Sequence, residues 1–166
     1  MQFIVVNEIS EWLQSREVDT GEDTWQPRIP ELKHRYRTRF AHGVKSGKAQ
    51  YLASQAISTS LEWSEAVLWI AAWGIWASSE DWPQYYALRG SNGERRSLDD
   101  APGHIFQRRE YSLLISFLTL TLENAWDAHV FFSTSAKQLG TIIRTSHDEW
   151  IELQTQEPLS NDPFAA

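Results

Sequence analysis

The chain contains no cysteine, and this absence excludes several kinds of protein at once. A disulfide framework, a thiolate zinc site, an iron–sulfur cluster and a cysteine nucleophile all require the thiol group. The fold must therefore be stabilised by packing alone. A chain without disulfides also fits a reducing compartment, so we expect a cytoplasmic protein.

Long apolar segments and export signals are missing as well. The longest apolar run covers residues 66–77, which is too short for a membrane-spanning helix of roughly 20 residues. The first apolar residues are soon followed by Asn7 and Glu8, which is not the pattern of a secretory signal. We therefore expect neither export nor contact with a membrane.

The composition is that of a folded protein with an excess of acidic groups. Of the 166 residues, 42% are hydrophobic and 22% are charged, and the net charge is −7. These values predict one globular domain over residues 1–166, with a loop-rich segment at 14–32 and a loose tail at 157–166. The negative charge argues against a general nucleic-acid binder and favours a basic protein as partner.

Positive charge is concentrated between residues 28 and 48. Within this stretch Arg35, Arg37 and Arg39 recur with a period of two, which places all three on one face of an extended strand. We favour an edge strand that its positive charge keeps unpaired. The alternatives are a stripe that binds phosphate or carboxylate groups and, as a minor hypothesis, a contact with nucleic acid.

The spacing of apolar residues predicts the main helices and strands. Helices are expected from Asn7 onward and over residues 48–60, 78–90 and 108–124, and strands over residues 127–132 and 141–145. The run over residues 66–76 favours a central strand, with a buried helix as the alternative. These elements predict an α+β (or α/β) domain with helices packed on a small mixed sheet of three or four strands.

The segment Ser146-His147-Asp148-Glu149 matches a capping box, in which the serine and the glutamate bond to the backbone of a helix start. It predicts a short terminal helix, although residues 150–154 could equally form a strand. Because capping explains His147, we assign this residue no catalytic role.

The histidines show no spacing typical of a metal site, so we expect no metal and no cofactor. His104 follows Asp99 and Asp100 in a glycine-containing loop over residues 90–107. An enzyme in which Asp100 orients His104 as a general base is therefore the alternative functional hypothesis. The favoured interpretation of His104 is structural, as a residue that leads from a turn into the following helix.

Tryptophan is unusually frequent, with nine residues. Tryptophan and tyrosine dominate the binding energy of many protein interfaces, because they bury a large area at a small entropic cost. One segment combines aromatic and acidic side chains, namely Trp76, Glu80, Asp81, Trp82, Tyr85 and Tyr86. This mixture indicates either a docking face or aromatic residues that simply fill the core.

Several motifs resemble those of a group of small uncharacterised bacterial proteins, with which no activity is associated. They are Ser78-Ser79-Glu80-Asp81-Trp82, Tyr85-Tyr86, Ala101-Pro102-Gly103-His104 and Ser146-His147-Asp148-Glu149-Trp150. In size, acidity, aromatic content and lack of a catalytic motif, the chain is also similar to immunity proteins that neutralise bacterial toxins. This second resemblance implies a toxin partner and no particular residue roles.

Our leading functional hypothesis is a protein-binding module, of the immunity type, that inhibits a basic bacterial toxin or enzyme. Complementary charge would speed the encounter, and buried aromatic residues would hold the complex. A homodimer formed through exposed aromatic residues would also fit. The predicted partner-binding residues are Glu80, Asp81, Trp82, Tyr85, Asp99 and Asp100.

Overall fold

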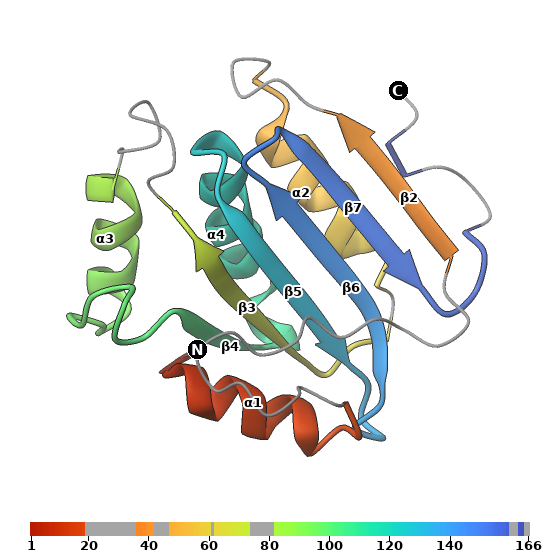
Figure 1. The fold of residues 1–166 in the computed structure, drawn as a ribbon, viewed down its shortest axis with the longest axis horizontal. Helices are drawn as coiled ribbons and strands as arrows, with labels where there is room; N and C mark the ends of the chain where they lie inside the picture. Colours follow the sequence, from red (N-terminus) through yellow and green to blue (C-terminus); the bar gives the residue numbers. More distant parts are fainter. Residues whose placement is uncertain (19–35, 42–46, 61, 74–81, 160–162, 165–166) are drawn as a thin grey trace.

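The computed structural model describes residues 1–18, 36–41, 47–60, 62–73, 82–159 and 163–164 (Figure 1). From residue 19 on, the predicted loop at 14–32 lies outside this part of the chain. The described strands are β1 (Gln2–Ile4), β2 (Tyr36–Ala41), β3 (Glu65–Ala72), β4 (Gly103–Gln107), β5 (Asp127–Ser133), β6 (Leu139–Ser146) and β7 (Trp150–Thr155). The described α-helices are α1 (Val6–Gln14), α2 (Ala49–Ser58), α3 (Trp82–Ser91) and α4 (Tyr111–Glu123).

All seven strands form one sheet in the order β1-β4-β3-β5-β6-β7-β2, and every pair of neighbours is antiparallel. The α+β class is therefore confirmed. The prediction of a mixed sheet of three or four strands was wrong, because the described sheet has seven strands and its neighbouring strands are all antiparallel. The basic strand β2 lies at one edge of the sheet, as the favoured interpretation of its arginines required. Arg35 precedes β2 and lies outside the described residues.

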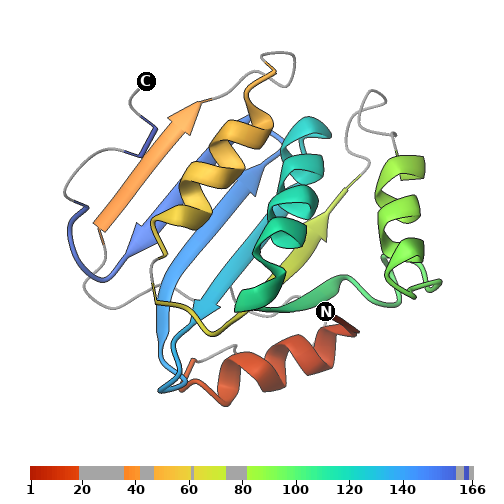
Figure 2. The same ribbon diagram turned by 180° about the vertical axis from the view of Figure 1, so that it is seen from behind.

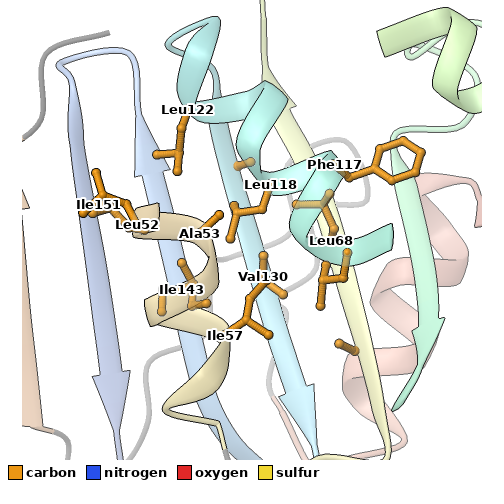
Figure 3. Close-up of a cluster of buried hydrophobic side chains, with 14 of the residues drawn as sticks. Leu52, Ala53, Ile57, Leu68, Phe117, Leu118, Leu122, Val130, Ile143 and Ile151 are labelled. Atoms are coloured by element: carbon orange, nitrogen blue, oxygen red, sulfur yellow. The ribbon is translucent and has the colours of Figure 1, made fainter. Parts of the chain in front are cut away.

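The two faces of the sheet differ. Helices α2 and α4 lie side by side on one face (Figure 2). Leu68, Val130 and Ile143 point from three strands into the core beneath these helices (Figure 3). Because side chains alternate along a strand, their neighbours point to the opposite face. We call it the open face because α2 and α4 do not lie on it.

Helix α1 covers part of the open face, at one end of the strands (Figure 1). Ile9 of α1 packs in a second core cluster with Val67 and Phe131. The close approach of β1 and α1 to β4 requires a glycine in β4. A Cβ atom on Gly103 would stand 2.5 Å from Ile4 Cγ1 and 2.8 Å from Ile9 Cγ1. The rest of the open face carries the polar side chains discussed below.

The ambiguous apolar run forms a strand over Glu65–Ala72. This strand pairs with β4 on one side and with β5 on the other, and both of its faces are covered. A strand buried on both faces has a continuous apolar sequence, and the same sequence would suit a buried helix. The favoured prediction for this segment is therefore confirmed within the described residues.

Of the two alternatives after Ser146, the strand over residues 150–154 is confirmed by β7. The terminal helix was wrong, because the segment that matches a capping box is the turn between β6 and β7. Ser146 Oγ accepts a hydrogen bond from the backbone N–H of Asp148 (3.2 Å), and the backbone N–H of Glu149 donates to the Ser146 carbonyl (3.0 Å). Glu149 has a φ of 58°, as the last residue of a three-residue hairpin loop often does. The serine makes a local bond of the capping kind, but the bond closes a turn.

Two contacts are described in the segment that was predicted as a loose tail. Thr155 Oγ1 donates to the Glu157 carbonyl (2.6 Å). Phe164 is buried, with its ring centroid 5.8 Å from that of Phe40 in β2.

None of the helices in the described ranges has the length and apolar character that crossing a membrane requires.

Candidate functional site

The docking face predicted around α3 is only partly described. Glu80 and Asp81 lie outside the described residues, and Trp82 is the first residue of α3. Tyr85 is fully buried, and its ring centroid lies 4.9 Å from that of Trp126. Its burial corrects the prediction of Tyr85 as a surface anchor, because the ring fills the core.

Asp99 and Asp100 are exposed on the loop that follows α3. The fully buried Arg89 of α3 holds this loop, since its guanidinium donates to the carbonyl oxygens of Ala101 (2.9 Å) and Ser97 (3.2 Å). Burial lowers the pKa of Arg89, although hydrogen bonds satisfy much of its donor capacity. The two acids thus stand on a loop whose conformation is fixed from inside the molecule.

The structure does not assemble the predicted pair of His104 and Asp100. His104 lies in β4 rather than in a loop, and it is fully buried with its Nε2 atom 3.1 Å from Arg89 Nη1. A guanidinium can only donate, so Nε2 accepts and the ring is neutral. Burial and then the charge of Arg89 lower the pKa of His104 to about 3. Within the described chain, Asp100 accepts instead from Ser97 Oγ (2.8 Å).

A different set of polar residues lies together on the open face. The strand register places five side chains opposite one another, and we call this line the cross-strand row. Neighbouring strands lie about 4.8 Å apart, so each side chain can reach the next. The row consists of Trp69 on β3, His129 on β5, Arg144 on β6, Glu152 on β7 and Arg39 on β2.

Glu152 is the centre of the charged half of the row and is fully buried. Its Oε2 atom accepts from Arg39 Nη2 (2.7 Å) and Nε (3.1 Å), and its Oε1 atom accepts from Gln154 Nε2 (2.8 Å). Arg37 Nε and Arg144 Nη1 lie 3.3 Å and 3.9 Å from Oε1. Burial alone would raise the pKa of Glu152, but the bonds from Gln154 and Arg39 and the nearby charges lower it. The carboxylate is therefore ionised.

Three guanidinium groups of the described residues surround this one carboxylate. The side chains of Arg37 and Arg39 are 37% and 50% exposed. The Trp150 ring lies under the Arg39 guanidinium, with its centroid 4.0 Å from Cζ, in the geometry of a cation–π contact. We call Arg37, Arg39 and Trp150 the arginine patch. An anion from solvent could reach this patch, because both guanidiniums are partly exposed. Glu152 holds the Arg39 guanidinium from its buried side.

His129 separates the apolar and charged halves of the row. Burial, and then the charge of Arg144, lower its pKa to about 3, while Asp127 acts in the opposite sense. Its ring centroid is 5.4 Å from that of Trp69, and its Nδ1 atom has no hydrogen-bond partner among the residues described. The ring is neutral near pH 7 and adds no charge to the arginine patch.

A second polar contact involves His147 in the β6–β7 turn. Asp127, at the start of β5, lies 2.9 Å (Oδ2) and 3.0 Å (Oδ1) from His147 Nδ1 and accepts the backbone N–H of the same residue (2.8 Å). His147 is 33% exposed. The bond to Asp127, opposed by partial burial and aided by the charges of Asp127 and Asp148, raises the pKa of His147. The imidazolium form is thus favoured.

Sequence reasoning missed Glu152, Gln154 and Asp127. The alternation of polar and apolar residues over 150–154 was the signal for the first two, since it puts Glu152 and Gln154 on one face of a strand. That strand was considered as an alternative, without a role for its polar face. Asp127 carried no local signal, because its partner lies twenty residues away.

Within the described ranges, no group of three or more histidine and acidic side chains is placed to hold a metal ion. No protein-family model, curated protein or solved structure matches the chain. The functional conclusion therefore depends on the geometry of the open face.

Proposed function

We propose that this protein binds an anionic ligand, through a carboxylate or phosphate group, at the arginine patch on the open face. The observation that supports this proposal is that two half-exposed guanidiniums converge on one buried carboxylate. The side chain of Arg39 is half exposed, so an anion from solvent can reach its guanidinium.

The patch is organised before any ligand arrives. Arg39 is fixed by two hydrogen bonds to Glu152 and by its stacking on Trp150. A side chain that is already ordered loses little conformational entropy on binding, so more of the contact energy appears as affinity. Planar guanidiniums also match the geometry of carboxylate and phosphate oxygens.

Calorimetric titration with inorganic phosphate and with acetate at pH 6 tests the proposal. Arg39→Gln should weaken binding at least tenfold, because a charge-assisted hydrogen bond contributes about 1.5–3 kcal/mol. Arg95→Gln is the matched control, since Arg95 is exposed on the loop between α3 and β4, whereas β2 lies at the opposite edge of the sheet from β1 and β4. Equal affinities for the wild type and Arg39→Gln, or no saturable binding of either anion, would refute it.

The inhibitor hypothesis is a second candidate, favoured by the exposure of Asp99 and Asp100 on a loop that Arg89 fixes. A rigid acidic loop suits a basic protein surface. A basic protein recovered from the native host in stoichiometric amount, and inhibited by this chain, would support it. Asp99→Lys with Asp100→Lys should then lower the affinity by clearly more than threefold, and a smaller change would exclude this loop as the docking site.

A further inference from the structure

We infer that His147, held by Asp127, is a positioning residue that couples the affinity of the arginine patch to pH. The inference rests on the proposed anion binding and adds a form of regulation to it. His147 itself is not proposed to touch the ligand. It acts through the turn that carries Trp150.

The contact between His147 and Asp127 ties the β6–β7 turn to the neighbouring strand β5. The Asp127 carboxylate receives both the ring Nδ1–H and the backbone N–H of His147, at 2.9 Å and 2.8 Å. Ser146 Oγ and the Ser146 carbonyl close the turn from within. The position of the turn relative to β5 therefore depends on a bond that a proton on His147 strengthens.

The turn leads directly to Trp150, which is the first residue of β7. Trp150 lies opposite Ser146 on β6 and opposite Ala41 on β2. Its ring is the platform on which the Arg39 guanidinium rests. A shift of the turn therefore moves the platform of the arginine patch, and the distance from the turn to the platform is only a few residues of chain.

The described charged groups near His147 favour the same protonation state. Asp127 faces the ring from β5, and Asp148 Oδ1 lies 3.7 Å from Nε2 within the turn. Glu149 is exposed and next in the turn. These acidic neighbours favour the imidazolium form of His147 at slightly acidic pH. The bond to Asp127 then weakens as pH rises through the pKa of His147.

The two other described histidines do not interfere in the same pH range. His104 and His129 have pKa values of about 3, so both are neutral from pH 5.5 to 8.5. A pH effect that depends on the residue at position 147 is thus separable from the titration of these two histidines.

Sulfate is the appropriate probe, because it is a dianion at every pH in this range. Titrations of the wild type from pH 5.5 to 8.5 should show an affinity that falls about threefold as His147 loses its proton, the usual size for a partly exposed ion pair. The indole N–H signal of Trp150 in NMR spectra should shift with the same midpoint as the ring signals of His147.

His147→Asn is the matched variant, because the asparagine amide can still donate to Asp127 but never carries a charge. Its sulfate affinity should be independent of pH, and His147→Ala should be weaker than His147→Asn throughout. A wild-type affinity that is flat with pH, or a pH profile unchanged in His147→Asn, would overturn the inference. Absence of sulfate binding, or binding that Arg39→Gln leaves intact, would instead overturn the proposed function.

Discussion

Mild acid should destabilise this protein strongly, because two histidines are buried in neutral form. His104 and His129 have native pKa values of about 3, whereas an unfolded histidine titrates near 6.5. Below pH 6.5 the unfolded chain therefore binds a proton at each position and the native chain does not. Acid stabilises the state that binds more protons, which here is the unfolded chain. The free energy of unfolding therefore falls as pH falls from 6.5 towards 3.

The magnitude follows from the unfolded pKa. A pH of 5 lies about 1.5 units below the pKa of an unfolded histidine. Each unit corresponds to about 1.4 kcal/mol of protonation free energy. Each buried histidine thus costs about 2 kcal/mol at pH 5, and both together cost about 4 kcal/mol relative to pH 7. Any native pKa below about 4 gives the same result. The loss is large beside a typical total stability of about 5–15 kcal/mol.

The other groups with a resolved pKa shift in the described part of the chain contribute little between pH 7 and 5. His147 has a raised pKa, so its bond to Asp127 is fully formed below the unfolded pKa and is lost as pH rises through the native value. This contribution has the opposite sign and stays below about 1 kcal/mol, because the pair is partly exposed. Glu94, whose pKa is lowered to about 2, loses its stabilising effect only at lower pH.

Urea unfolding at pH 7 and pH 5, followed by tryptophan fluorescence, measures the effect. The buried Trp126 is a suitable reporter. In His129→Leu the difference between the two pH values should be about half that of the wild type, since one of the two histidines with a strongly lowered pKa, His104, then remains. Comparing each protein with itself removes the packing cost of the substitution. The reasoning fails if the wild type changes by less than about 1 kcal/mol, or if His129→Leu keeps the full difference.

Three further substitutions test other parts of the structure. Glu152→Gln should lower the free energy of unfolding by about 2–3 kcal/mol in urea titrations, because the guanidiniums around it lose their buried counter-charge; an unchanged midpoint would contradict this. Gly103→Ala should cost about 1–3 kcal/mol through its clash with Ile4 and Ile9. Its control, Gly90→Ala in α3, meets nothing within 4 Å and should stabilise by about 0.5–1 kcal/mol, and equal effects of the two would refute the argument. Arg89→Met should cost about 3 kcal/mol and open the loop over residues 94–101 to proteolysis, and a loop that stays protected would show that other contacts hold it.

Much of the sheet could be predicted where a strand is long and apolar. Strands β3, β5 and β6 have clear apolar patterns in the sequence. These strands are mostly buried, and β-branched and aromatic residues pack well in such strands. Strand β1 has only three residues, which is too few for a period to be recognised. Strand β4 is short and begins at Gly103, and a glycine after a proline is typical of a turn. The number of strands was underestimated for these reasons.

The C-terminal error has a more specific cause. A serine followed three residues later by a glutamate can close the first turn of a helix or the loop of a hairpin, since the local hydrogen bonds are of the same kind. Pairing of Ser146 with Trp150 across the turn decided between the two. Only the neighbouring strands supply that information, and a local pattern does not contain it.

The candidate site could be found only in part. The alternation of Arg37 and Arg39 located them on one face of a strand, which the structure confirms. Their common partner Glu152 is 113 residues from Arg39, so no local spacing connects them. The prediction for His104 relied on its sequence neighbour Asp100, whereas the strand directs the ring to Arg89 in α3.

The pairing of β2 with β7 also has a consequence for the order of folding. The strands β5, β6 and β7 are joined by short turns and can form hairpins early, because closing a short loop costs little entropy. The edge strand β2 must wait for a partner that is made more than one hundred residues later. On the ribosome, its arginines therefore emerge long before the carboxylate that they surround. The proposed anion site is therefore completed last, and it is absent from a chain that has not finished folding.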